Sequence, residues 1–339
     1  MYSYRLHQFG PEARPHLNEE PVPQPLAHQV LLRITACSLN YRDLAILRAA
    51  STLSPKAGLI PLSDGVGEVI TTGENVSLFR PGDRVAGCFF PHWQAGPLTA
   101  EKGRGTYGSQ SDGWLTQYKV VDEQALVAIP DYLSDEEAAT LPCAAVTAWN
   151  SVQQSRPLQP GETLLIQGTG GVSLFALQFA RLMGVNVIAL TSDEQKAALL
   201  RQLGANEVIN YRQHPNWSSE VRRLTHGRGV DRVVEIGGPG TLQQSLLSCA
   251  SGAEIALLGF VAKGDETVDF FTLFKSGTTV RPFSVGSRDD FIAMNRALTT
   301  AKLRPVVDKV FPFTQAVEAW DYFEQRQHIG KVVIRFTHE

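Results

Sequence analysis

The fold is decided by the stretch Leu-Leu-Ile-Gln-Gly-Thr-Gly-Gly-Val-Ser, residues 164–173. An apolar run ends there in a cluster of glycines, and a segment with a helical pattern, 174–183, follows at once. Glycines at such a strand–turn–helix junction let the backbone approach a pyrophosphate, while the helix presents free N–H groups and a positive dipole end to the phosphates. We therefore expect this stretch to bind a dinucleotide.

Individual positions of the turn have distinct expected tasks. Gly168 permits the tight turn, Gly170 keeps a Cβ out of the path of the pyrophosphate, and Ser173 is small enough to hold the helix close to the strand. The expected cofactor-binding residues of the turn are Gly168, Thr169, Gly170, Gly171 and Val172.

The middle of the chain alternates between short apolar runs and helical patterns. The apolar runs that we predict as strands cover residues 163–167, 186–190, 207–210, 232–236, 254–258 and 279–283. Helical patterns separate most of them, notably over 193–203, 218–224 and 241–250. Repeated strand–helix units of this kind predict an α/β fold with a doubly wound parallel sheet of the Rossmann type.

The flanking parts of the chain are predicted to be rich in strands. Residues 30–34, 67–70 and 84–87 are strand candidates separated by turn-forming Pro and Gly. Residues 331–335 form a last strand candidate, which we expect to return to the amino-terminal part of the chain because it does not continue the strand–helix alternation. The Gly-rich and aromatic-rich stretch 89–113 lacks periodicity, which is typical of a lid or a mobile loop.

Composition narrows the class of protein. A chain of 339 residues with 19% charged residues and a net charge of −3 is ordinary for a globular enzyme of two domains. No apolar run approaches the roughly 20 residues of a spanning helix, and the charge does not indicate binding to nucleic acid or to a membrane surface. The cysteines lack CxxC spacing, as expected for reduced thiols in a cytoplasmic protein; they are Cys37, Cys88, Cys143 and Cys249.

The chain resembles the medium-chain dehydrogenase/reductase superfamily over nearly its whole length. The segments that carry the resemblance are residues 36–44, 63–69, 168–172 and 330–334. The nearest resemblance is to the zinc-free, quinone-oxidoreductase-like branch, often labelled alcohol-dehydrogenase-like. It implies a GroES-like, β-rich catalytic domain formed by residues 1–123 and 288–339, with a Rossmann NAD(P)-binding domain, 124–287, inserted between them.

The resemblance also indicates that metal ligands are missing. Zinc enzymes of this superfamily bind the metal through a Cys, a His-Glu pair and a second Cys, whereas here these positions resemble Asn40, the pair Ser63-Asp64, and Cys143. A catalytic zinc needs about three protein ligands, and Asn and Ser are poor ones, so we expect none. Cys143 then reads as a small buried residue beside the cofactor. Cys88 is alone in the stretch of the structural zinc lobe, so we expect no structural zinc either.

The absence of a metal favours a particular chemistry. Zinc stabilises an alkoxide as a Lewis acid, and without it the charge on a substrate oxygen needs hydrogen-bond donors or a proton source. We therefore expect hydride transfer from NAD(P)H to a quinone, enone or enal, with a small carbonyl or quinone molecule as the partner. The alternatives are zinc-independent interconversion of alcohols and aldehydes, and an NADPH-binding protein without turnover.

The expected catalytic residues lie in two of the resembling segments. Asn40 and Tyr41 are able to donate to a substrate oxygen, and Asp43 is close by in the same segment. Ser63 and Asp64 line the former metal site by resemblance, and a buried Asp64 would need a partner or a raised pKa.

Structural roles are open for some of these residues. Asn40 is a possible helix cap, and Asp43 is a candidate for an ion pair with Arg42 or Arg84. Four residues of the long loop are expected either to cover the substrate or to pack between domains, with His92 a weak candidate for a general acid; the four are Phe89, Phe90, His92 and Trp93.

The end of the second strand in the sheet decides between NADP and NAD. NAD enzymes typically have an acid there for the ribose, and this sequence has Thr191, followed by Ser192 and Lys196. These residues favour NADP, although Asp193 and Glu194 argue mildly against a phosphate and NAD stays possible.

Further cofactor contacts are expected at the carboxyl ends of the strands, where open α/β sheets bind ligands. The candidates by position are Gly237, Gly259, Phe260, Ser284 and Val285. By resemblance, Tyr211 and Arg212 flank the adenosine, Thr147 lies beneath the nicotinamide, and Lys331 reaches the pyrophosphate; the alternative for Lys331 is a strand-edge lysine.

The strand predicted at 279–283 is the last of its sheet and is expected to be an unpaired edge in a single chain. Edges of this kind are commonly covered, and the resembling family often pairs this one across a two-fold axis. We therefore expect a homodimer.

Overall fold

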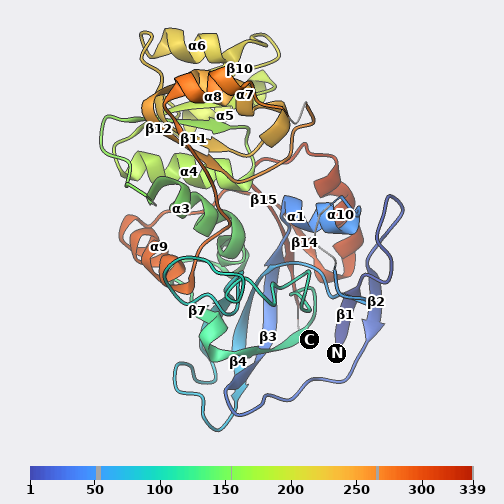
Figure 1. The fold of residues 1–339 in the computed structure, drawn as a ribbon. Helices are drawn as coiled ribbons and strands as arrows, with labels where there is room; N and C mark the ends of the chain where they lie inside the picture. Colours follow the sequence, from blue (N-terminus) through green and yellow to red (C-terminus); the bar gives the residue numbers. More distant parts are fainter. Residues whose placement is uncertain (51–54, 154, 265–266, 338–339) are drawn as a thin grey trace. The chain divides into compact units, whose positions relative to one another are not determined.

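The chain divides into two units. The computed structural model describes residues 1–50, 55–153, 155–264 and 267–337. One unit comprises Met1–Val146 and Gly286–Glu339, and the other comprises Thr147–Val285. We expected the Rossmann domain to cover residues 124–287. In the structure the second unit is shorter, because residues 124–146 and 286–287 group with the first unit. Both ends of the chain therefore belong to one unit, as Figure 1 shows.

The second unit is built on a parallel sheet of six strands in the order β10-β9-β8-β11-β12-β13. Its strands are β8 (Thr163–Gln167), β9 (Asn186–Thr191), β10 (Glu207–Asn210), β11 (Val230–Glu235), β12 (Cys249–Leu257) and β13 (Thr279–Pro282). Central strands such as β8 and β11 are buried; β8 is largely apolar, whereas β11 also carries Asp231, Arg232 and Glu235. The strand order changes direction between β8 and β11, which confirms the predicted doubly wound fold.

Helices separate these strands along the chain (Figure 1). They are α3 (Val146–Gln153), α4 (Gly171–Leu182), α5 (Glu194–Gln202), α6 (Trp217–Leu224), α7 (Leu242–Ser248) and α8 (Phe270–Ser276), with the short helix η3 (Gly238–Gly240) before α7. None of the helices within the described residues is long and apolar enough to cross a membrane.

The first unit is built on a sheet of seven strands, as the GroES-like prediction requires. Six follow the order β14-β15-β3-β4-β5-β7, and β6 pairs with β3; a separate pair is formed by β1 and β2. The strands are β1 (Tyr2–Arg5), β2 (His16–Glu19), β3 (Gln29–Ser38), β4 (Asp64–Thr72), β5 (Arg84–Gly87), β6 (Tyr118–Asp122), β7 (Leu126–Ala128), β14 (Val307–Pro312) and β15 (Lys331–Arg335). The helical elements are α1 (Tyr41–Leu47), η1 (Glu123–Ala125), α2 (Asp135–Ala138), the π-helical turn η2 (Leu141–Ala145), α9 (Arg288–Ala301), η4 (Phe313–Gln315) and α10 (Ala316–Glu324).

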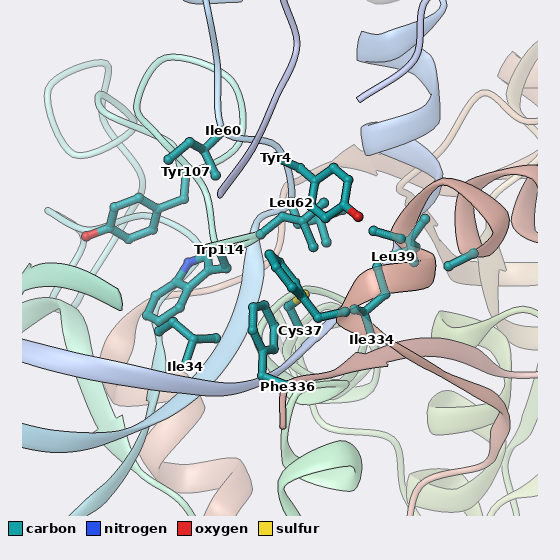
Figure 2. Packing of buried hydrophobic residues seen from close by; sticks show 14 of the residues in the cluster. Tyr4, Ile34, Cys37, Leu39, Ile60, Leu62, Tyr107, Trp114, Ile334 and Phe336 are labelled. Carbon is teal, nitrogen blue, oxygen red and sulfur yellow. The ribbon is translucent and has the colours of Figure 1, made fainter. Parts of the chain in front are cut away.

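The core of the first unit is packed around Trp114, which is fully buried (Figure 2). Gly65 on β4 and Gly87 on β5 leave the space for its indole ring. A Cβ added at Gly87 would lie 1.9 Å from Trp114 Cζ2, and one added at Gly65 would lie 2.4 Å from Trp114 Cε3. Because no side chain fits at either position, both strands depend on glycine for this close approach.

The last strand returns to the amino-terminal part of the chain, as predicted. β15 pairs antiparallel with β3, with Val333 opposite Ser38 and Ile334 opposite Cys37. On its other side β15 pairs in parallel with β14. The carboxyl-terminal segment thereby lies inside the first unit, next to the end of β3.

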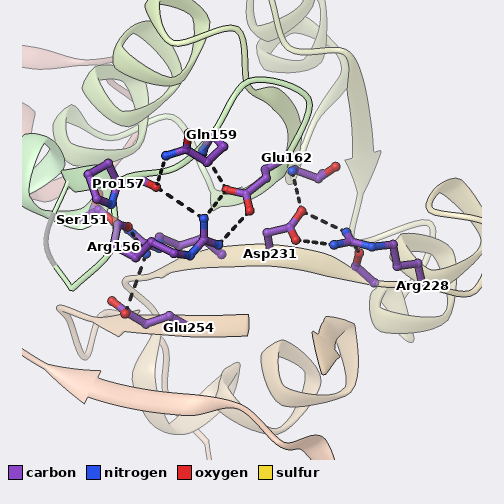
Figure 3. Close-up of polar contacts among 11 residues, drawn as sticks. Ser151, Arg156, Pro157, Gln159, Glu162, Arg228, Asp231 and Glu254 are labelled. Carbon is purple, nitrogen blue, oxygen red and sulfur yellow. Dashed lines mark hydrogen bonds and ion pairs between the residues drawn. The ribbon is translucent and has the colours of Figure 1, made fainter. Parts of the chain in front are cut away.

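Figure 3 shows a group of polar contacts in the second unit that includes Ser151, Arg156, Asp231 and Glu254. Arg232 on β11 donates to the backbone carbonyls of Ser151 at 2.9 Å and Arg156 at 2.8 Å, and it lies 3.7 Å from Glu254 on β12. Beside it, Asp231 accepts a hydrogen bond of 2.8 Å from the backbone N–H of Thr163. These contacts connect the start of β8 with β11 and with Glu254 in β12.

Candidate functional site

The glycine turn after β8 has an open cradle above it. Gly168 has φ +73°, in the left-handed region that glycine adopts without strain, and Gly170 is the N-cap of α4 with φ −76° and ψ 171°. A Cβ added at either position would meet no described atom within 4 Å. The hydroxyl of Ser173 donates to the carbonyl of Gln167 at 2.6 Å, which holds the start of the helix against the strand. The turn therefore offers room and helix N–H groups for an anion, and its expected binding role fits this geometry.

A buried polar network fixes the loop after β11, and sequence reasoning missed it. The carboxylate of Glu235 accepts hydrogen bonds from the backbone N–H groups of Gly237 at 2.9 Å and Gly238 at 2.8 Å. Gln167 donates to the same carboxylate at 2.7 Å, and its oxygen accepts from Gly237 at 3.0 Å. The available signal was a lone carboxylate at the end of an apolar strand, since a buried charge needs partners. The network holds Gly237, an expected cofactor contact, at the carboxyl edge of the sheet.

The residues expected to choose between NADP and NAD lie at the ends of β9 and β10. Thr191 is 1% exposed, and its hydroxyl has no hydrogen-bond partner among the described residues. Ser192 and Lys196 are half-buried, whereas Tyr211 is exposed and its backbone N–H donates to the carbonyl of Thr191 at 3.0 Å. The side chain of Asp193 caps α5 by accepting from the N–H of Lys196 at 2.8 Å. Ser192 and Lys196 thus present surface to a ligand, and Thr191 has a buried hydroxyl without a partner among the described residues.

The remaining cofactor candidates of the second unit follow its other strands. Gly259 and the exposed Phe260 follow β12, and the exposed Ser284 follows β13. Val285 is buried with φ +49°, and its carbonyl accepts a hydrogen bond of 2.7 Å from the side chain of Asn150. Thr147, the first residue of the unit, is buried. Their predicted contacts with the cofactor stay predictions.

In the first unit, Asn40 and Asp43 are brought together at the start of α1. Asn40 is the N-cap residue, and its backbone N–H donates to the Asp43 carboxylate at 2.8 Å. The same carboxylate lies 3.2 Å from the guanidinium of Arg42, one of its two expected ion-pair partners. The other, Arg84, pairs with Asp135 instead. Burial raises the pKa of Asp43 to about 6, although the charge of Arg42 opposes that rise.

Ser63 and Asp64 lie together at the start of β4. The hydroxyl of Ser63 donates to Asp64 at 2.8 Å, and the other carboxylate oxygen accepts from the backbone N–H of Cys143 at 3.1 Å. Both side chains are fully buried, so Asp64 has the partners that its burial requires. Burial, and then the charge of Asp64, raise the pKa of the Cys143 thiol, which therefore stays neutral.

Lys331 lies in this same group of residues. Its ammonium donates to the carbonyl of Leu39 at 2.6 Å and to Oδ1 of Asn40 at 2.6 Å, and the residue is 3% exposed. Burial lowers the pKa of Lys331, whereas the nearby Asp64, Cys143 and Asp43 raise it. Its expected contact with the pyrophosphate stays a prediction.

Tyr41 is directed elsewhere. Its hydroxyl accepts from the guanidinium of Arg326 at 3.3 Å, and that guanidinium lies 5.0 Å from the centre of its ring. The predicted contact of Tyr41 with substrate stays a prediction.

The aromatic segment 89–113 is formed by turns and one isolated bridge. Phe89, Phe90 and Trp93 are buried and pack edge to face in sequence, while His92 is exposed. The aromatic side chains are therefore part of the packing of the first unit. A lid function for this segment, and a role for His92 as general acid, stay predictions.

The residues present do not fit a catalytic zinc ion. The described part of the chain contains no group of three or more His, Cys, Asp or Glu side chains that could hold a metal. Moreover, Oδ1 of Asn40 faces the ammonium of Lys331, so a dication there would meet a positive charge instead of ligands.

Two family models match the chain. One, described as the alcohol dehydrogenase GroES-like domain, matches residues 26–131, and one described as zinc-binding dehydrogenase matches residues 171–300. A zinc-type alcohol dehydrogenase-like protein of Schizosaccharomyces pombe is 41% identical over 94% of this chain and 94% of its own length. A quinone oxidoreductase of Sus scrofa is 25% identical over 98% of this chain and 97% of its own. A solved structure titled NAD-dependent alcohol dehydrogenase matches with a TM-score of 0.89 at 31% identity, covering 99% of both chains.

The raised pKa of Asp43 predicts a specific pH dependence of stability. Below about pH 4 the Asp43 carboxyl is protonated in both the folded and the unfolded chain. Between about pH 4 and about pH 6 it is ionised in the unfolded chain but still protonated in the folded one. We expect the unfolding free energy of the wild type, relative to Asp43→Asn, to fall by about 3 kcal/mol across this range, measured by urea denaturation.

Asp112→Asn is the matched control with the opposite sign. Burial raises the pKa of Asp112, but the bonds from Lys56 and from the backbone of Ile60 bring it below its ordinary value. The wild type should therefore gain stability relative to Asp112→Asn as pH rises. A difference between wild type and Asp43→Asn that does not change with pH would contradict the analysis of the site.

Proposed function

Because the chain belongs to the medium-chain dehydrogenase/reductase superfamily and is thus an oxidoreductase that uses a nicotinamide cofactor, we propose that it reduces quinones, enones or enals without catalytic zinc. The observation that carries the proposal is the chemistry around Asn40. Asn40, which by resemblance corresponds to a cysteine ligand of the zinc enzymes, has a buried amide whose oxygen accepts from the buried ammonium of Lys331.

This arrangement suits reduction of a conjugated acceptor. A nicotinamide cofactor, when bound, would supply the hydride; the acceptor carbon would take it, and the substrate oxygen would carry delocalised negative charge until the product takes a proton from solvent. Nδ2 of Asn40 is buried and has no acceptor among the described residues, so it is available to donate to that oxygen. Donors of this kind, when they are held in place before the reaction, stabilise an oxyanion, and loss of one typically costs about 10²–10³ in kcat.

Zinc-independent interconversion of alcohols and aldehydes is the second candidate. The names of two similar proteins, one from Schizosaccharomyces pombe and one with a solved structure, favour it. A saturated alkoxide concentrates its charge on one oxygen, however, and a neutral amide stabilises it less well than a metal ion would. We therefore favour substrates in which the negative charge left by hydride transfer is delocalised over several atoms.

A substrate screen tests the proposed function. We expect oxidation of NADPH with a benzoquinone, cyclohex-2-enone or a 2-enal at rates well above those with a saturated aldehyde, measured by the loss of absorbance at the reduced nicotinamide. Turnover of the saturated aldehyde alone would support the second candidate, and binding of NADPH without turnover of any acceptor would indicate a non-catalytic protein.

We further propose NADP as the preferred cofactor. Ser192 and Lys196 present surface at the end of β9, and no carboxylate stands at the strand end itself, where Thr191 lies. The carboxylate of Asp193 is engaged in capping α5, which ties up the acid nearest to the position of a 2′-phosphate. A lysine near that position would attract the 2′-phosphate of NADPH, a group that NADH lacks.

The cofactor preference predicts a measurable ratio. We expect kcat/KM for NADPH to exceed that for NADH, and Lys196→Gln to reduce the ratio by roughly tenfold, since a charge-assisted contact contributes about 1.4 kcal/mol or more. Lys309→Gln, at an exposed position of the first unit, is the control and should leave the ratio unchanged. Equal values of kcat/KM in the wild type would remove the proposal.

We also propose that the chain forms a homodimer through β13. This strand pairs with β12 on one side and ends the sheet on the other. The preceding helix α8 exposes Phe270, Phe271 and Phe274 at 67%, 62% and 75%. An open strand edge beside three exposed phenylalanines is the kind of surface that proteins cover.

The proposed interface predicts the mass in solution. Light scattering should give twice the chain mass of 37.1 kDa for the wild type. The double variant Phe270→Asp with Phe274→Asp should shift the mass toward that of one chain. Leu26→Asp, at a position that is 71% exposed in the first unit, should remain dimeric. A wild-type mass of a single chain would refute the homodimer.

A further inference from the structure

The contact between Lys331 and Asn40 determines which way the Asn40 amide points. An ammonium group has three hydrogen donors and no acceptor, so the Asn40 atom that lies 2.6 Å from it must be the oxygen. The amide nitrogen, Nδ2, then necessarily points away from Lys331. A second acceptor, the carbonyl of Leu39 at 2.6 Å, holds the ammonium in place.

Nδ2 of Asn40 is a buried donor without an acceptor in this arrangement. The residue is 8% exposed, and Nδ2 has no hydrogen-bond partner among the described residues. Buried donors without a partner are uncommon, because each one loses its bonds to water. A ligand that carries an acceptor would supply the missing hydrogen-bond partner of Nδ2, and the oxygen of a carbonyl compound is such an acceptor.

The start of the helix engages the oxygen of this side chain but not its nitrogen. Asn40 is the N-cap of α1 and forms a capping box with Asp43, and Lys331 donates to Oδ1 of Asn40, which can accept more than one hydrogen bond. The Asp43 carboxylate accepts from the backbone N–H of Asn40 at 2.8 Å, and the N–H of Asp43 donates to the Asn40 carbonyl at 3.0 Å. None of these contacts uses Nδ2, which stays without an acceptor among the described residues.

The charges around the pair keep Lys331 in its role. Asp43 and Asp64 lie close enough to favour the charged ammonium against the effect of its burial. The positive charge of the Lys331 ammonium beside Oδ1 polarises the Asn40 amide. This makes the amide N–H groups better donors, as in other chains of hydrogen bonds within a protein interior. The ammonium itself has two short hydrogen bonds and is buried.

We propose that Lys331 is a positioning residue that orients the Asn40 amide so that Nδ2 donates to the carbonyl oxygen of the substrate. The inference rests on the proposed function and deepens it, because it names the substrate group that is recognised: a single carbonyl oxygen conjugated to the carbon that accepts hydride. Lys331 acts through Asn40 and does not touch the substrate or the cofactor.

A double-mutant cycle tests whether Lys331 acts through Asn40. The four proteins are the wild type, Lys331→Met, Asn40→Ala and the double variant, each assayed for kcat and KM with NADPH and cyclohex-2-enone. We expect Asn40→Ala to lower kcat by about 10²-fold and Lys331→Met by about tenfold. In the Asn40→Ala background, Lys331→Met should change kcat by less than about twofold, because the residue through which it acts is gone. Equal effects of Lys331→Met in both backgrounds would overturn the proposal.

Binding of NADPH provides a readout that does not depend on turnover. We expect its dissociation constant, measured by fluorescence titration, to be the same for the wild type and Lys331→Met. A rise of about tenfold or more would assign the lysine to the pyrophosphate instead and would overturn the proposal. Lys309→Met, at an exposed position, is the control and should change neither kcat nor binding.

Two further proteins separate folding from positioning. Lys331→Arg keeps the positive charge and should recover part of the kcat lost in Lys331→Met. Asn40→Asp keeps an oxygen for Lys331 but has no N–H donor, so it should fold, as judged by near-ultraviolet circular dichroism, and still lose about as much kcat as Asn40→Ala. An Asn40→Asp variant with wild-type kcat would contradict the role of Nδ2.

The experiments distinguish failure of the proposed function from failure of this inference. If the wild type reduces only saturated aldehydes, the proposed function fails, and the same cycle run with an aldehyde still shows whether Lys331 acts through Asn40. If the wild type reduces enones and the cycle shows independent effects, the proposed function stands and this inference fails.

Discussion

The antiparallel pairing of β15 with β3 is the constraint on which the candidate site depends. Leu39, just beyond the end of β3, donates its backbone N–H to Val332 at 3.1 Å, and this register places Lys331 beside Asn40. On the other side of β3, the pairing with β4 places Asp64 opposite Ser38. Three segments that are far apart in the sequence thus meet at one strand end. The chemistry that we propose therefore depends on the return of the chain to its first unit.

Buried charges of both signs lie close together at this site. Two buried carboxylates, Asp43 and Asp64, are each satisfied by hydrogen bonds from backbone and side chains. The positive charges nearest to them come from Arg42 and Lys331. One of the matching family models is described as zinc-binding dehydrogenase, yet the residues at the strand end are those of a hydrogen-bonding site. In our account the side chains present, more than the family to which the chain belongs, decide which acceptors the protein reduces.

Much of the second unit could be predicted from sequence because its signals are local. The strands at 163–167 and 207–210 follow from short apolar runs, and the turn at Gly168 follows from the need for a positive φ. The burial of Thr191 and the network at Glu235 could not be predicted, since both depend on which neighbouring strands pack against them.

In the first unit the sequence predicted the elements better than the side-chain contacts. The strand at 331–335 and its return were predicted, but the direction of the Lys331 ammonium depends on an acceptor 291 positions away in the chain. Tyr41 likewise meets Arg326, which no local pattern indicates. The most direct test of a site that works through Asn40 and Lys331 is the zinc content of purified, active protein, measured by plasma mass spectrometry before and after treatment with a chelator. Our account predicts far less than one zinc per chain and unchanged turnover after chelation; one zinc per chain, with turnover lost when it is removed, would contradict it.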